Sequence, residues 1–191
     1  MTELLVIVAV VGLFVLLVYP RFSGPEKNSA HQATDISNIK QCGVAFFVYA
    51  EEHGGFYPTT NTTSTDLFNY LTNDGYITTP SIVAGSGATP LSSATCFTSD
   101  NVAWGCAEGL TTKDNPGYAL LWSAGTAPSV TNGNLILDAS NTYWGKKGKR
   151  FTAVYYLNGS ASCPHFTPGS FISTNPLSGS STNVYTHYLN P

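Results

Sequence analysis

The chain has 191 residues, a length that suits one domain with a real hydrophobic core and leaves little room for a second one. Only 10 % of the residues are charged, well below the roughly 25 % of an average soluble domain. Eight Lys and Arg against eleven Asp and Glu give a net charge of −3, which excludes a strongly basic surface for nucleic acid or anionic lipid.

The first element in chain order is the apolar segment Leu4–Tyr19, LLVIVAVVGLFVLLVY. As a helix it would be about 24 Å long, close to a hydrocarbon core of about 30 Å once its flanks are included. Since it is apolar on every side, it is not an amphipathic surface helix. Three interpretations compete: a cleaved signal peptide, a plain membrane anchor, and a helix that serves both in a bilayer and in a fibre.

The residues around the segment separate these interpretations. A signal peptide needs a basic start and a small-residue cleavage site, whereas Glu3 precedes the apolar run and Pro20 and Arg21 follow it. A plain anchor has no use for Glu3, because an ionisable group at the edge of a span is costly and usually functional. The residues favour the third interpretation.

The segment from Met1 through Gly12 to Pro20 resembles the N-terminal methylation segment of type IV pilins and type II secretion pseudopilins. Glu3, the Leu-Leu-Val after it, Gly12 nine residues later and Pro20 eight residues after that keep the family's relative spacing. The resemblance implies that Met1, Glu3, Gly12 and Pro20 act in filament assembly, with Glu3 neutralising the N-terminal ammonium of a neighbouring subunit. A carboxylate in an apolar bundle is tolerable only beside such a cation.

The position of the glutamate departs from the family, where it is the fifth mature residue and not the third. A shift of two positions turns a side chain by about 200° around a helix, so the atom that Glu3 pairs with stays open.

A second helix is predicted from the break at Gly24–Glu26 to about His53, ended by Gly54 and Gly55. Its apolar residues recur at three- and four-residue steps and predict one face that covers a sheet; they are Ile36, Ile39, Gly43, Phe46, Phe47 and Ala50. The stretch from Gln41 to Pro58 also resembles the end of the long helix in major pseudopilins.

The remainder of the chain predicts a short helix around residues 66–71 and three strands bounded by Gly, Asn or Pro. The strand candidates are residues 117–122, 134–137 and 151–156, and Asn158-Gly159 is a hairpin signal after the last of them. Residues 155–160 resemble the closing strand and turn of pseudopilin-like heads. The tail after Cys163 is expected to be extended, with a last strand at 183–189.

Four cysteines allow three disulfide connectivities, and no pair has zinc-ligand spacing. We predict a bridge between Cys96 and Cys106, which would close a short loop worth about 3 kcal/mol. Cys42 and Cys163 are expected to be either bridged to each other or free.

No catalytic motif is present, and the four histidines are scattered, so we expect no enzyme activity and no catalytic residue. No cofactor is expected. Asp100, Asp114 and Asp138 are weak candidates for calcium, as some pseudopilins hold this ion in a loop; turn and capping roles are the default.

Together these patterns predict an α+β, pilin-like fold in which a long N-terminal helix packs on a small antiparallel sheet. Residues 1–22 would form the membrane and filament-core helix, 23–55 its amphipathic second half, and 56–191 a globular head with a variable loop, the sheet and an extended tail. The resemblance implies a structural subunit of an extracellular, type IV pilus-like filament, with itself, a prepilin peptidase and an inner-membrane assembly platform as partners.

The subunit would reside in a bacterial inner membrane before assembly and in a cell-surface filament afterwards. A major pseudopilin of a type II secretion system is the alternative of the same architecture. A monomeric membrane-anchored binding domain is the alternative of a different class.

Overall fold

The structure is a computed structural model, and it describes residues 26–60, 62–85, 88–93, 96–124, 127–131, 134–138, 150–166, 171–173 and 187–189. The chain divides into two units, residues 1–31 and 32–191. The described residues of the first unit are the opening turns of helix α2. The predicted apolar helix of residues 1–22 lies outside the described residues.

Helix α2 (Glu26–Glu52) is the longest described element and falls within the predicted helical range 23–55. Its C-terminal end is set by glycines, as predicted. Gly54 and Gly55 have φ of 68° and 90°, a left-handed conformation that costs glycine little. The amide of Gly55 donates to the carbonyl of Ala50 at 2.7 Å, which satisfies one of the last helical carbonyls.

Helix α3 (Ser64–Asn73) confirms the short helix predicted around residues 66–71. Thr63 caps it: the Thr63 hydroxyl oxygen accepts from the amide of Asp66 at 3.2 Å and donates to the Asp66 carboxylate at 2.8 Å. A turn at Gly75 (φ 85°) follows, and a single 3-10 turn, η1 (Pro80–Ile82), comes next.

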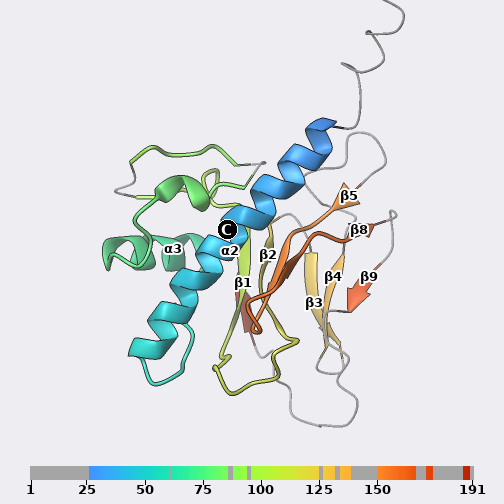
Figure 1. Cartoon of the computed structure of the whole chain (residues 1–191). Coiled ribbons are helices and arrows are strands. Elements are labelled where there is room, and N and C mark those ends of the chain that lie inside the picture. Colours follow the sequence, from blue (N-terminus) through green and yellow to red (C-terminus); the bar gives the residue numbers. More distant parts are fainter. Residues whose placement is uncertain are drawn as a thin grey trace, which may run out of the picture. The chain divides into compact units, whose positions relative to one another are not determined.

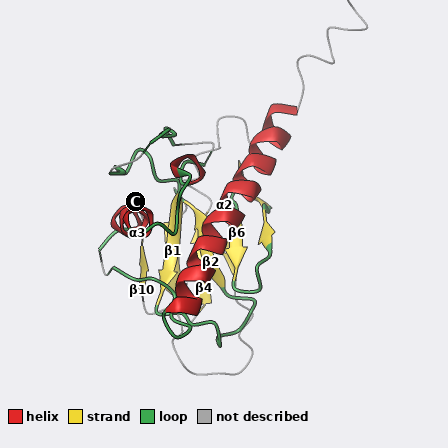
Figure 2. Ribbon diagram, turned by 60° about the vertical axis from the view of Figure 1, so that its left-hand side comes forward, coloured by secondary structure: helices red, strands yellow, loops and turns green. Residues whose placement is uncertain are grey.

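The main sheet has five strands, and every pairing in it is antiparallel. In spatial order the strands are β10 (His187–Leu189), β1 (Trp104–Glu108), β2 (Ala119–Ser123), β6 (Val154–Tyr156) and β7 (Ala161–Ser162). Asn158-Gly159 forms the predicted hairpin between β6 and β7, with Gly159 at φ 78°. Figure 2 shows this sheet with α2 in front of it.

Two smaller antiparallel sheets complete the described strands. β3 (Ala127–Thr131), β4 (Asn134–Asp138) and β9 (Phe171–Ser173) form a three-stranded sheet in the order β3-β4-β9, and β5 (Arg150–Phe151) pairs with β8 (His165–Phe166). The predicted strands at 117–122, 134–137, 151–156 and 183–189 each overlap an observed strand. The described part of the chain is therefore α+β, with helices beside antiparallel sheet.

The core lies between α2 and the main sheet (Figure 1). At residue 43 the helix and the sheet are so close that a Cβ atom would overlap the ring of Tyr155, so glycine permits the contact. The Trp104 indole N–H donates to the carbonyl of Ile82 at 3.0 Å, and the Cys42 thiol donates to the same oxygen at 3.6 Å. One carbonyl thus joins η1 to both β1 and α2.

Two sequence predictions need correction in this region. The stretch before Cys106 is not simply a loop, since β1 begins at Trp104 and lies inside the sheet with all five residues buried. Phe47 is not part of the buried face of α2: it is 46 % exposed, whereas Ile39, Phe46 and Ala50 are fully buried. Phe47 follows Phe46 directly, and the 100° step per residue turns it out of the contact with the sheet.

Candidate functional site: the outer face of α2 and its groove

The predicted assembly residues Met1, Glu3, Gly12 and Pro20 all lie outside the described residues. Within the part of the chain that the structure describes, no helix combines the length and apolarity of a membrane span. The site that the described residues offer is instead on α2, on the side that faces away from the sheet.

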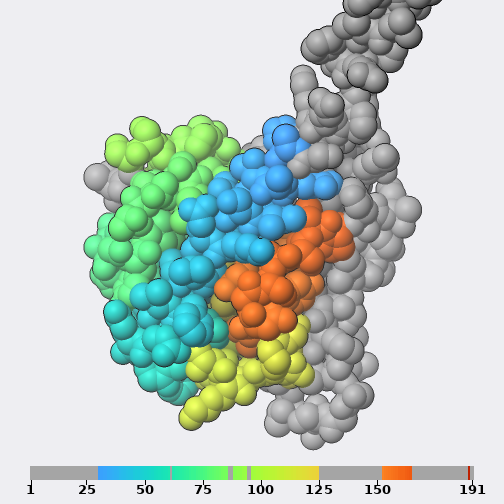
Figure 3. All heavy atoms as spheres, in the orientation of Figure 1, coloured from blue at the N-terminus to red at the C-terminus, as the bar shows by residue number. Residues whose placement is uncertain are grey.

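Three large apolar side chains form what we call the outer face of α2: Val44, Phe47 and Val48. They are 58 %, 46 % and 43 % exposed, respectively. Steps of three and four residues bring them to one side of the helix, opposite the buried Phe46. Figure 3 shows α2 on the surface, between the part of the chain that carries α3 and the β6–β7 hairpin. Exposed apolar residues that gather on one face of a helix make that face a candidate interaction surface.

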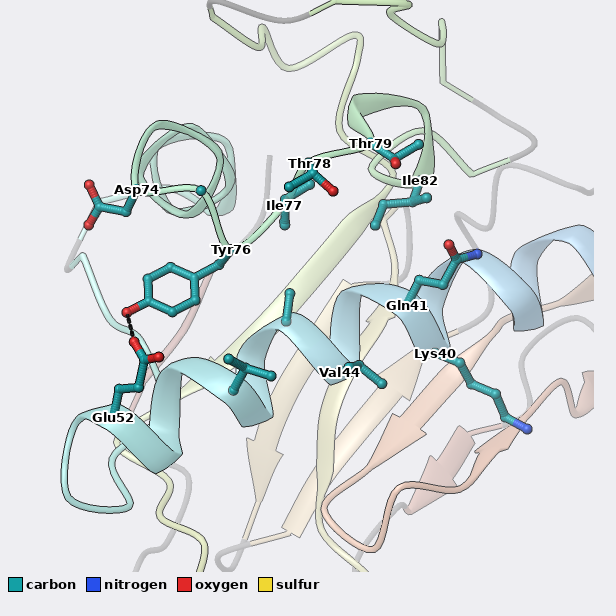
Figure 4. A pocket seen from close by; sticks show the side chains of 13 residues that line it. Lys40, Gln41, Val44, Glu52, Asp74, Tyr76, Ile77, Thr78, Thr79 and Ile82 are labelled. Carbon is teal, nitrogen blue, oxygen red and sulfur yellow. Dashed lines mark hydrogen bonds between the residues drawn. The ribbon is translucent and has the colours of Figure 1, made fainter.

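A groove of about 600 Å³ runs beside this face, between α2 and residues 74–82 (Figure 4). Val44, Ala45 and Val48 supply the apolar wall from the helix, and Ile77 and Ile82 supply it from the facing segment. Polar residues stand around these walls: Lys40, Gln41, Glu52, Asp74, Thr78 and Thr79. An apolar groove with a polar rim is suited to an apolar side chain from a partner.

The charges at the groove differ between its two ends. Glu52 and Asp74 lie at the end near Tyr76, while Lys40 lies twelve residues before Glu52 on the helix. The Tyr76 hydroxyl donates to the Glu52 carboxylate at 2.6 Å, a bond that Figure 4 shows across the acidic end. This bond holds the proton on the phenol and, with the nearby negative charge, raises the pKa of Tyr76 to about 12.

An aromatic cluster supports the acidic end of the groove. The rings of Tyr49 and His53 stack with centroids 3.8 Å apart, and Tyr49 meets Tyr76 and Tyr70 edge-on at 5.3 and 6.1 Å. Such pairs contribute about 0.5–1.5 kcal/mol each beyond their buried area. Hydrogen bonds to Tyr49 and Asp74 raise the pKa of Tyr70. The cluster ties the start of the 74–82 segment to the end of α2.

A second apolar feature lies just past the end of α2. Phe56 is 64 % exposed, more than any other large apolar side chain that the structure describes. It pairs with Thr111 in an isolated β-bridge, and the Thr112 amide donates to the carbonyl of Gly55 at 2.8 Å. The exposed Lys113 follows in the same turn. Phe56 is not among the residues that line the groove.

The predicted Cys96–Cys106 disulfide is not formed, and all four cysteines are free thiols. Cys106 is buried within β1, whereas Cys96 is exposed next to Phe97. The backbone of Phe97 is fixed to α3, since Asn69 donates to its carbonyl at 3.1 Å and accepts from its amide at 2.5 Å. This attachment explains why the two cysteines belong to different parts of the fold.

Cys42 and Cys163 are also unbridged. Cys42 points at the carbonyl of Ile82, and burial raises the pKa of its thiol strongly. Burial, aided by the negative charge of Asp35, raises the pKa of Cys163 to about 12. Burial likewise raises the pKa of the Cys106 thiol, with Glu108 adding to the shift. These three thiols are therefore poor nucleophiles at neutral pH.

The weak calcium candidates do not form a cluster. Among the residues that the structure describes, no group of three or more His, Cys, Asp or Glu is placed to hold a metal ion. Asp114 closes a turn, accepting from the Thr111 amide at 2.6 Å and from the Thr111 hydroxyl at 2.9 Å. Asp100 lies in an exposed turn and Asp138 in β4.

Sequence reasoning missed the outer face of α2, the groove and Phe56. The signal for the outer face was Val44 and Val48, which make α2 apolar on more than one side. The groove joins segments distant in sequence, so no local pattern predicts it. No protein-family model matches the chain, and no curated protein or solved structure matches it either.

Proposed function

We propose that this chain is the structural subunit of a type IV pilin-like filament, and that it is not an enzyme. The observation that carries the proposal is the outer face of α2: Val44, Phe47 and Val48 are exposed on the helix that follows the apolar segment 4–19. A monomer gains nothing from three neighbouring apolar side chains in water, whereas a subunit buries them against its neighbours.

The sequence adds two further supports. The segment 4–19 is apolar on every side, and the pattern of Glu3, Gly12 and Pro20 resembles the pilin methylation segment. The α+β arrangement of α2 on an antiparallel sheet agrees with the fold that this resemblance implies. The finer features, namely the apolar first half of a long helix and a pilin-like head, are part of the proposal.

The proposed subunit resides in a bacterial inner membrane before assembly and in a cell-surface filament afterwards. Its partners are further copies of itself, a prepilin peptidase and an inner-membrane assembly platform. Glu3 neutralises an N-terminal ammonium of a neighbouring copy. The same architecture serves a major pseudopilin, in which the fibre is a short periplasmic one.

Cryo-electron microscopy of sheared cell-surface material tests the proposal. We expect helical fibres of this chain, with residues 4–19 in the fibre core and the outer face of α2 covered by neighbouring copies. Short fibres that stay in the periplasm would identify the pseudopilin. If the protein remains a monomer in the membrane fraction, it is an anchored binding domain and not a filament subunit.

Two variants connect the test to the surface that carries the proposal. Phe47→Glu places a charge on the outer face without touching the core, and we expect it to abolish fibres while the protein stays folded and membrane-bound. Glu51→Gln changes an exposed neighbour on the same helix and should leave the fibres intact. Normal fibres from the Phe47→Glu protein would contradict the assigned role of the outer face.

A further inference from the structure

We infer that Phe56 of one copy inserts into the α2 groove of the next copy and forms a head-to-tail contact. The inference rests on the proposed function only in taking a second copy as the occupant of the groove. It names which two surfaces meet, and neither surface contains a residue of the apolar segment 4–19.

Phe56 combines high exposure with a fixed backbone. At 64 % it is the most exposed large apolar side chain that the structure describes, and its backbone is held by its neighbours. Gly54 and Gly55 make the turn that presents it, and the bridge to Thr111 fixes it from the other side. Phenylalanine has only two side-chain torsions, so burying it on a backbone that is already fixed costs little conformational entropy and makes it a good interface anchor.

The groove is large enough for an aromatic ring and has apolar walls. Its volume of about 600 Å³ exceeds what one phenyl ring needs, and its walls are Val44, Val48, Ile77 and Ile82. Phe56 does not line the groove of its own chain. The contact is therefore between copies.

The charges near Phe56 and at the groove are opposite in sign. Lys113 is exposed in the turn that pairs with Phe56, and Asp114 of that turn is already engaged by Thr111. The groove carries Glu52 and Asp74 at one end. With Phe56 in the groove, Lys113 meets this acidic end, and the hydrogen bond from Tyr76 leaves the second Glu52 oxygen available to it.

The two surfaces are different patches of the same chain, and this has a geometric consequence. A contact between unlike patches leaves a free Phe56 at one end of the pair and a free groove at the other end. Repetition of such a contact produces an open helical series when the rotation does not close into a ring. Growth beyond the dimer is therefore expected.

Sedimentation of the purified full-length chain in detergent micelles tests the contact, since detergent covers the segment 4–19. We expect association that grows beyond a dimer with concentration and is weakened about tenfold or more by Phe56→Ser. Asp100→Ser, which alters an exposed turn residue outside the groove and outside the outer face of α2, is the control and should change little. Equal behaviour of the two variants, or growth that stops at a dimer, would overturn the inference.

Two charge variants test the orientation. Lys113→Glu should weaken association, and the double variant Lys113→Glu/Asp74→Lys should restore it. A double variant that is as weak as Lys113→Glu alone overturns the assigned pairing. Circular dichroism on each variant checks that the fold is kept, because all of these positions are exposed.

Photo-crosslinking identifies the partner surface directly. A benzophenone side chain in place of Phe56, in unlabelled protein mixed with ¹⁵N-labelled protein, should crosslink to residues 44–48 or 77–82 of the labelled copy. Crosslinks within one copy, or to any other surface, overturn the inference. Fibres on cells that persist in Phe56→Ser would refute the inference alone, whereas the absence of fibres from the unaltered chain would refute the proposed function.

Discussion

The inner and outer faces of α2 carry similar residues but have different surroundings. On the inner face, Phe46 is fully buried against the core and Gly43 lets the helix meet the ring of Tyr155. On the outer face, Val44 and Phe47 are adjacent to these residues in sequence but remain exposed. The difference teaches that apolarity alone does not place a residue in the core of its own chain. The inner face stabilises the monomer, and the outer face adds less burial to it.

The largest difference is expected when Phe46 of the inner face and Phe47 of the outer face are each replaced by alanine. Phe46→Ala removes a buried ring that contacts Phe68 at a centroid distance of 5.8 Å, and it should lower the free energy of unfolding by about 3–5 kcal/mol. Phe47→Ala should change it by less than about 0.5 kcal/mol. Chemical denaturation of both proteins in the same detergent measures the difference. Similar losses for the two would show that the outer face is also part of the monomer's core.

The second test adds a methyl group at Gly43, where α2 lies against the ring of Tyr155. Gly43→Ala should lower the free energy of unfolding by about 1–3 kcal/mol, because the new methyl group displaces the ring of Tyr155. This loss is expected although alanine favours a helix by about 1 kcal/mol over glycine.

A matched pair of variants checks the cause. In a Tyr155→Leu background the cost of Gly43→Ala should be smaller, since the ring that the methyl group meets is gone. Val44→Ala, one residue away on the outer face, should have little effect on unfolding. If Gly43→Ala lowers the free energy of unfolding equally in the Tyr155→Leu background, the ring of Tyr155 is not the cause of the loss.

The smallest expected effect concerns Tyr76 and Glu52 at the acidic end of the groove. Because the bond to Glu52 raises the pKa of Tyr76 from 10 to about 12, its contribution to stability is fully present below pH 10 and is lost as the pH rises toward 12. Glu52→Gln removes the negative charge and should return the pKa of Tyr76 toward 10. Titration of ¹³C-labelled tyrosine by NMR measures this, with Glu51→Gln as the control. A Tyr76 pKa that stays near 12 in Glu52→Gln would exclude Glu52 as the cause.

Much of the fold follows from local signals in the sequence. The glycines at 54 and 55 end α2, and Asn158-Gly159 makes the hairpin, because in each case the backbone needs a conformation that few residues adopt easily. The strand β1 was not predicted. It is buried on both faces, so it has no alternating pattern, and its small residues Gly105 and Ala107 carry no strand signal.

The candidate site was less predictable than the fold. Periodicity assigned Phe47 to the buried face, because apolar residues at three- and four-residue steps fit more than one side of α2. The groove depends on the packing of residues 74–82 beside the helix, which sequence spacing does not determine. The prediction of a Cys96–Cys106 bridge rested on the length of the loop between them. It did not include the attachment of Phe97 to Asn69, which sequence does not show.

The pairing of β1 with β10 determines when the sheet can be completed during synthesis. Cys106 of β1 lies opposite both Leu121 of β2 and Leu189 of β10. The pair β1–β2 can form early, whereas β10 follows β2 by a long stretch of chain and is synthesised much later. Until then β1 is an open edge with unpaired backbone groups. The sheet therefore cannot be completed at this edge until residues 187–189 have been synthesised.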